Sequence, residues 1–132
     1  MLECFIAGDS IAVGISKEMK KCKAAVEVGI SSKRWVAQKQ VMDANTTIIS
    51  LGANDGPKVD SKKELTALRN SIKSKRVIWI LPAAKPAQRD AIFLIAKERG
   101  DTVIDVKSVP LAKDKKHPNP AGYKELAKKI SK

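Results

Sequence analysis

The stretch Ile6-Ala7-Gly8-Asp9-Ser10-Ile11-Ala12-Val13-Gly14 decides the fold, because it leads from an apolar run into a helix through Gly-Asp-Ser. The pattern predicts a buried strand, a sharp corner and a helix, with the hydroxyl of Ser10 at the corner. Free N–H groups of the first helical turn would lie beside that hydroxyl and favour negative charge there. Gly-Asp-Ser is also ordinary turn and N-cap chemistry, so this stretch alone does not establish a catalytic serine.

Two later stretches carry the polar groups that a serine nucleophile needs. Ser50-Leu51-Gly52-Ala53-Asn54-Asp55-Gly56 follows a β-branched run, and Asp114-Lys115-Lys116-His117-Pro118 lies near the C-terminus. With Gly-Asp-Ser, Gly-x-Asn-Asp and Asp-x-x-His-Pro in this order, the sequence resembles the SGNH (GDSL) hydrolase family of esterases and lipases. The resemblance spans nearly the whole chain.

The rest of the chain alternates short apolar runs with helical patterns. Strands are predicted at residues 2–7, 24–28, 46–51, 77–81 and 102–106. Helices are predicted at residues 10–21, 33–43, 58–75 and 86–99, with a last helix that has Asn119 as N-cap and Pro120 in first position. This alternation indicates an α/β protein with a five-stranded parallel sheet covered on both faces. The resemblance implies a three-layer α/β/α, flavodoxin-like fold, which we expect to be a single domain over residues 1–132.

The candidate catalytic residues are Ser10, His117 and Asp114. A serine hydroxyl needs a base within hydrogen-bond reach, and His117 is the only histidine of the chain. Pro118 biases that histidine toward an extended loop. The resemblance assigns Asp114 the task of orienting the imidazole. The alternative is that Asp114, which has lysines on both sides, belongs to a solvated run of charges.

Acyl transfer also needs donors for the developing oxyanion. The resemblance implies the backbone N–H of Ser10, a backbone N–H in a second block, and the side-chain amide of Asn54. Ser32 stands in that second block where the family usually has glycine, and Gly29 is the alternative if the register is shifted. The matched aspartates of the first and third blocks, Asp9 and Asp55, are expected to fix loops.

Trp35 follows the second block and is a candidate substrate-binding residue, which could flank an acyl or sugar group. The alternative is that it packs its helix against the sheet. Trp79 lies in the middle of a predicted strand, so it is expected in the core.

The composition gives a formal net charge of +12, with 21 Lys and 5 Arg. One interpretation is a lysine-rich solvated surface, and the other is attraction to an anionic polymer or a charged substrate. Nucleic acid is a less favoured partner, because aromatic residues make up only 4% of the chain.

Cys4 and Cys22 are interpreted as free thiols, because two cysteines do not form a disulfide framework. A lone histidine gives no metal-binding pattern, so no metal or other cofactor is expected. Met1-Leu2-Glu3 lacks the basic start of a signal peptide and no apolar run could span a bilayer. We therefore expect a cytoplasmic protein without a transmembrane segment, with release or delivery outside the cell as the alternative.

The sequence thus predicts a serine esterase that hydrolyses short-chain or acetyl esters of a small molecule or carbohydrate, with carbohydrate O-deacetylation among its activities. The alternative is a binding module that keeps the fold and holds nucleic acid or an acidic polymer through its basic surface.

Overall fold

The computed structural model describes all 132 residues and contains one parallel sheet. Its strands are β1 (Leu2–Gly8), β2 (Lys23–Val26), β3 (Ala44–Ser50), β4 (Arg76–Leu81) and β5 (Thr102–Asp105). Its helices are α1 (Ser10–Glu18), α2 (Ser32–Gln38), α3 (Ser61–Asn70), α4 (Pro86–Arg99) and α5 (Pro120–Ile130), with a short 3-10 turn at Val106–Ser108. The strand order is β2-β1-β3-β4-β5, so the chain winds first to one side of β1 and then to the other.

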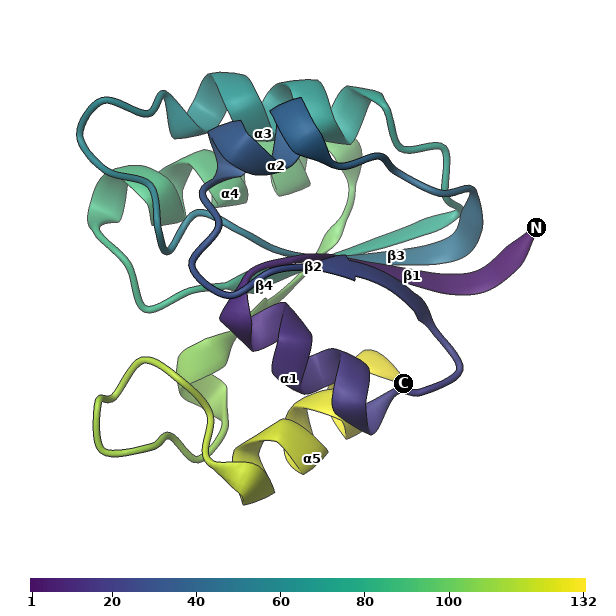
Figure 1. The fold of residues 1–132 in the computed structure, drawn as a ribbon, viewed down its shortest axis with the longest axis vertical. Coiled ribbons are helices and arrows are strands. Elements are labelled where there is room, and N and C mark those ends of the chain that lie inside the picture. The colour runs from purple at the N-terminus through teal and green to yellow at the C-terminus, as the bar shows by residue number, and fades with distance from the viewer.

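The helices form two layers around the sheet (Figure 1). Helices α2, α3 and α4 cover one face, and α1 and α5 cover the other. Each parallel crossover carries the chain from one end of the sheet back to the other, and a helix makes that return. The predicted three-layer α/β/α architecture is therefore confirmed.

The sequence of β1 is continuously apolar from Cys4 to Ala7, because both faces of this strand are buried. Phe5 and Ala7 belong to the core between the sheet and α2, α3 and α4. Cys4 and Ile6 point the other way, into the core beneath α1 and α5. A strand that is buried on both faces reads as a continuous apolar run, because successive side chains point to opposite faces.

Two glycines permit close packing of the Ser10 corner against its neighbours, the end of β3 and the last helix, α5. A Cβ at Gly8 would lie 2.1 Å from the carbonyl oxygen of Ser50, at the end of the neighbouring strand. A Cβ at Gly14 would lie 2.2 Å from the ring of Tyr123 on α5. The Ser10 corner therefore packs closely against the end of β3 and against α5, and the loop before α5 carries His117.

The element types follow the sequence, but several helices are shorter than predicted. Helix α2 ends at Gln38 rather than at residue 43, and α3 begins at Ser61, where the side chain of Asp60 caps it by accepting the N–H of Lys63. The predicted cap of α5 is confirmed, since Asn119 Oδ1 accepts the N–H of Gly122 at 2.8 Å. None of the helices is both long enough and apolar enough to cross a membrane.

The interpretation of Cys4 and Cys22 as free thiols is wrong, because they form a disulfide. Strand pairing explains this. Phe5 pairs with Lys23 in the parallel β1–β2 register, which puts the two preceding residues side by side with their Cα atoms 4.8 Å apart. Such a separation is within the normal range for a disulfide. Eighteen positions separate the cysteines, so only the sheet register reveals the pairing.

Candidate active site

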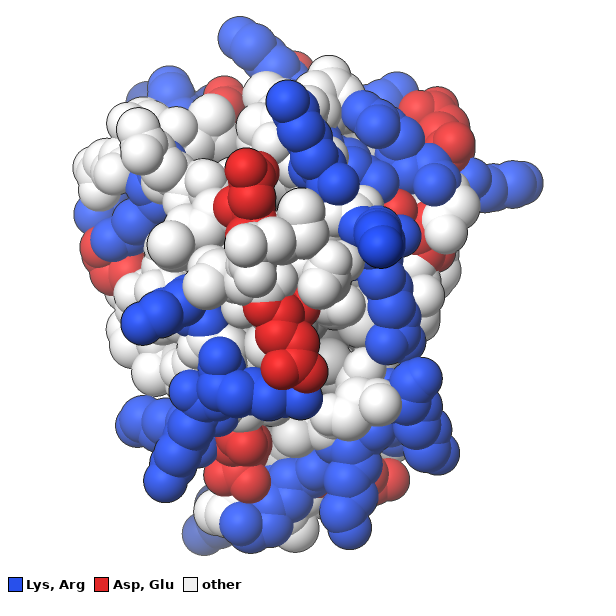
Figure 2. Space-filling view, turned by 90° about the vertical axis from the view of Figure 1, so that its right-hand side faces the viewer, with Lys and Arg blue, Asp and Glu red and all other residues white.

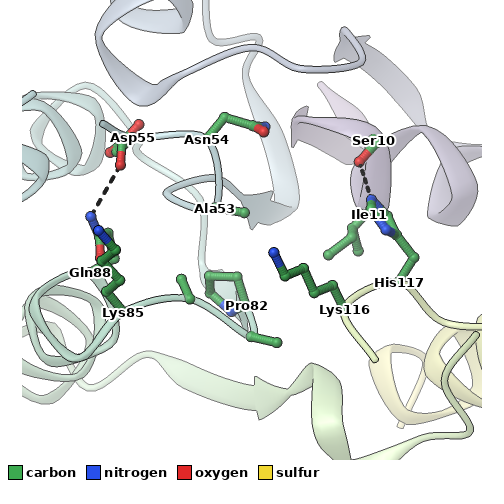
Figure 3. Close-up of a pocket in the computed structure, with 12 residues that line it drawn as sticks. Ser10, Ile11, Ala53, Asn54, Asp55, Pro82, Lys85, Gln88, Lys116 and His117 are labelled. Carbon is green, nitrogen blue, oxygen red and sulfur yellow. Dashed lines mark hydrogen bonds between the residues drawn. The ribbon is translucent and has the colours of Figure 1, made fainter. Parts of the chain in front are cut away.

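Polar residues from distant parts of the chain meet in a pocket of about 510 Å3 beyond the carboxyl ends of the strands. Ser10 follows β1, Asn54 follows β3, and His117 precedes α5. All three line the pocket, together with residues that follow β4 (Figure 3). Open parallel sheets place their binding sites at this edge, because loops from neighbouring strands converge there.

Ser10, His117 and Asp114 form a continuous hydrogen-bonded chain. Ser10 Oγ lies 2.8 Å from His117 Nε2 (Figure 3), and His117 Nδ1 lies 2.5 Å from Asp114 Oδ2. An imidazole that donates from Nδ1 to a carboxylate presents an unprotonated Nε2 to the hydroxyl. This arrangement can take the serine proton during attack on a carbonyl carbon.

The loop before α5 is wound so that Asp114 faces its own histidine. Asp114 Oδ1 accepts the backbone N–H groups of Lys116 and His117 at 2.9 and 3.0 Å. These bonds, followed by the hydrogen bond from the imidazole, hold the pKa of the Asp114 carboxyl well below its ordinary value. With this lowered pKa, the carboxylate stays ionised beside the imidazole. Lys115, which lies between Asp114 and Lys116 in sequence, adopts a left-handed φ of 58°, which is uncommon for a residue with a side chain.

Asp9 fixes the corner from inside. Its Oδ1 accepts the N–H of Ile11 at 3.1 Å and the hydroxyl of Ser50 at 3.3 Å, so it caps α1 and ties the corner to β3. The residue is 1% exposed and Oδ2 has no hydrogen-bond partner. Burial raises the pKa of Asp9 to about 6, because the hydrogen bonds offset only part of the cost of desolvating the charge.

Two donors are available to an oxyanion at Ser10. The backbone N–H of Ser10, at the start of α1, has no acceptor within the protein. The amide nitrogen of Asn54 donates one hydrogen to the carbonyl of Ile30 at 3.2 Å, which leaves its second N–H free. Figure 3 shows this amide extending toward the Ser10 side of the pocket.

The structure does not bring Ser32 to the pocket as a third donor. Its backbone N–H donates to Asp55 Oδ1 at 2.8 Å, and its hydroxyl donates to Asp55 Oδ2 at 2.6 Å. The N–H of Ser32 is therefore already occupied, and because the residue is fully buried a substrate cannot reach it. The alternative, Gly29, does not line the pocket either. Sequence reasoning missed this role of Ser32, because the acceptor comes from a distant loop.

Trp35 is likewise placed in the core and not at the pocket. The residue is 1% exposed, and its indole N–H donates to the carbonyl of Ala25 at 2.9 Å. The packing alternative therefore describes this residue, and a substrate contact is not supported. Trp79 is buried, as expected.

No family model matches the sequence, and no curated protein matches it. Solved structures do match. The chain superposes on a member of the lipolytic protein G-D-S-L family from Veillonella parvula with a TM-score of 0.62 at 18% identity, covering 99% of this chain and 97% of that one. A GDSL-like lipase from Bacteroides thetaiotaomicron gives a TM-score of 0.68 at 18% identity, covering 98% and 85%. A carbohydrate acetylesterase family member from Sinorhizobium meliloti gives a TM-score of 0.61 at 11% identity, covering 96% of this chain and 94% of that one.

The chain has the SGNH hydrolase fold. These matches extend over almost the whole length of the chain. The pocket lies at the edge of the sheet where the loops after β1, β3 and β4 converge.

Sequence reasoning missed the loop after β4 in this SGNH fold. Pro82, Ala83, Ala84 and Lys85 line the pocket, and so does Gln88 in the first turn of α4. The signal was present, because the loop after every parallel strand reaches the same edge and Pro82 marks the end of β4. Gln88 donates to the carbonyl of Asp55 at 3.2 Å and thereby joins the β4 loop to the Asn54 loop.

Proposed function

We propose that this protein is a serine hydrolase of the SGNH family that cleaves short-chain or acetyl esters. The observation that carries the proposal is the uninterrupted chain from Ser10 Oγ through His117 to the Asp114 carboxylate, at the mouth of a pocket. Ser10 and His117 are 107 positions apart in sequence, yet they lie within hydrogen-bond distance, as a serine nucleophile and its base require. The SGNH fold shared with a GDSL-like lipase and a carbohydrate acetylesterase supports the same chemistry.

The proposed reaction has two steps. Ser10 Oγ attacks the acyl carbon while His117 Nε2 takes its proton, and the carbonyl oxygen becomes an oxyanion. The Ser10 N–H and the free N–H of Asn54 would stabilise that oxyanion. His117 then gives the proton to the leaving alcohol as its bond to the acyl carbon breaks. In the second step water attacks the acyl-serine, loses a proton to His117, and Ser10 recovers its proton as the acid departs.

The disulfide bears on where this esterase would work. Disulfides persist in oxidising compartments and are rare in the cytosol of most cells. The bond between Cys4 and Cys22 therefore favours delivery to an oxidising environment over the cytoplasmic location expected from the sequence.

The structure offers less support for a binding module that uses its basic surface. On the side opposite the pocket, lysines and arginines are spread over the surface with acidic side chains among them (Figure 2). A module that tracks a polyanion is expected to gather its positive charge along one stripe.

A fluorophosphonate probe tests the proposal, because it phosphonylates only an activated serine. We expect one adduct, mapped by mass spectrometry to Ser10, and hydrolysis of p-nitrophenyl acetate that the probe abolishes. Ser10→Ala should show neither. An adduct on Ser16 or Ser50, or a Ser10→Ala protein that hydrolyses the ester at the parent rate, would overturn the proposal.

A further inference from the structure

Two lysines line the pocket from opposite sides: Lys116 on the side of the proposed nucleophile and Lys85 on the side of Gln88 (Figure 3). Lys85 is the N-cap residue of α4, and Lys116 lies directly before His117. In Figure 3 the ammonium of Lys116 points across the pocket toward Ala53. Neither side chain forms a hydrogen bond or an ion pair, which is also true of most other lysines of the chain; only Lys21, Lys39 and Lys124 have carboxylate partners.

No carboxylate forms an ion pair with either of these two lysines. Asp55 is the only acidic residue that lines it, and that carboxylate is buried. Its Oδ1 accepts from Ser32, and its Oδ2 accepts from the hydroxyls of Ser32 and Ser61 at 2.6 and 2.7 Å. Asp114 is bonded to His117 and does not line the pocket. The carboxylates of Asp55 and Asp114 thus accept hydrogen bonds from neighbouring groups, and neither forms an ion pair with Lys85 or Lys116.

The start of α4 adds to this positive field. No side chain caps the helix, because its N-cap residue is Lys85 itself and Pro86 follows. The uncapped end of a helix of 14 residues carries partial positive charge, and it lies at the same wall of the pocket as Lys85 and Gln88. Lys85 and the helix end thus come from one segment and Lys116 from another, and both segments line the same pocket.

From this arrangement we propose that the alcohol part of the substrate is anionic and that Lys85 and Lys116 bind its negative group. The inference rests on the proposed esterase function. An acetyl or short acyl group occupies little of a pocket of about 510 Å3, so most of that space is left for the alcohol part. A carboxylate or phosphate on the alcohol part would meet both ammonium groups, which makes the two lysines determinants of specificity and not of the bond-breaking chemistry.

A pair of similar esters tests this inference. Acetate esters of 4-hydroxybenzoate and 4-hydroxybenzamide have nearly the same shape, but only the first carries a negative charge. Their intrinsic reactivities differ, so the measure is the ratio of their kcat/KM values, compared between the parent protein and its variants. Lys85→Gln and Lys116→Gln should each lower this ratio by about threefold to fivefold, the effect of one solvent-exposed charge pair. Added salt should lower the parent ratio, because the lysines are exposed.

Lys20→Gln is the matched control, since Lys20 is exposed in the turn before β2 and does not line the pocket. It removes one charge and should leave the ratio unchanged. Hydrolysis of both esters with a ratio that neither pocket variant changes would overturn the anionic-substrate inference alone. An equal change in Lys20→Gln would overturn it too, by showing that net charge is responsible. Hydrolysis of neither ester would overturn the proposed function and this inference with it.

Discussion

Asp55 holds Ser32 through both carboxylate oxygens, one on the backbone N–H at 2.8 Å and the other on the hydroxyl at 2.6 Å. Both residues are buried. Ser32 begins α2, and Asp55 lies in the loop after β3, so the pair joins two loops at the edge of the sheet that carries the pocket. Ser32, which stands where the resembled family usually has glycine, therefore links the two loops through its hydrogen bonds to Asp55.

Ser32→Ala should lower the stability of the protein and leave its chemistry intact. The change leaves Asp55 Oδ2 with one fewer donor, and such a loss at a buried group costs about 1–3 kcal/mol of unfolding free energy. Urea unfolding measures this cost. Ser16→Ala, which removes a half-buried hydroxyl from α1, is the control and should have a smaller effect. A large loss of kcat in folded Ser32→Ala would show that the hydroxyl serves catalysis.

Asn54→Ala should lower kcat by roughly 10² to 10³, the usual loss for one oxyanion donor. The residue is exposed and its bond to the Ile30 carbonyl is the only one it makes, so the fold should persist. Hydrolysis of p-nitrophenyl acetate measures the loss. Asn45→Ala at the exposed start of β3 is the control. Equal activity of the two variants would remove Asn54 from the oxyanion site.

Asp114→Asn should lower kcat by about 10⁴, by analogy with the same exchange in another serine hydrolase. An amide keeps an oxygen for the backbone N–H groups of Lys116 and His117, so the loop should keep its shape. The amide, unlike the carboxylate, no longer favours the histidine tautomer that accepts the serine proton. Steady-state kinetics give the loss, and an unchanged circular dichroism spectrum excludes unfolding. A variant with more than a tenth of the parent kcat would contradict the assigned role.

Asp9 should make stability fall as pH rises from about 4 to 6. Its pKa is raised from 3.8 to about 6, so the folded protein holds this proton more tightly than the unfolded chain does. Stability from the protonated form is complete at low pH and is lost as pH rises toward the folded pKa, with a change of roughly 3 kcal/mol. Asp9→Asn should remove this component.

Urea unfolding at several pH values measures the difference between the parent protein and Asp9→Asn. Asp60→Asn, the same exchange at the exposed N-cap of α3, serves as control and should leave that component in place. A parent-minus-variant difference that is constant between pH 4 and 7 would show that Asp9 is not the group responsible.

Reduction of the Cys4–Cys22 disulfide should lower the unfolding free energy by about 3 kcal/mol, as the chain-entropy model gives for a loop of this length. Thermal unfolding with and without reductant measures the change. The Cys4→Ala/Cys22→Ala double variant should resemble the reduced protein and should not respond to reductant. Two reactive thiols in the untreated protein would show that the bond does not form.

Local sequence accounts for most of the fold and for part of the site. Apolar runs such as that of β4 identify their strands, because a parallel strand buried on both faces has no polar alternate. Helix ends were less predictable. The helix expected to reach residue 43 stops at Gln38, since β3 already begins at Ala44 and the chain must cross to it in between. Asn119 and Pro120 marked the start of α5 correctly, because a cap acts through neighbours in sequence.

The sequence by itself determined which side chains are chemically able to act: the single histidine, a serine at a strand-to-helix corner, and a carboxylate three residues before the histidine. The tertiary structure decided what each side chain meets. It joined Ser32 to Asp55, buried Trp35, paired Cys4 with Cys22, and set Lys85 and Lys116 around one pocket. These outcomes depend on strand register and on loops that converge from distant positions, so no local pattern of residues encodes them.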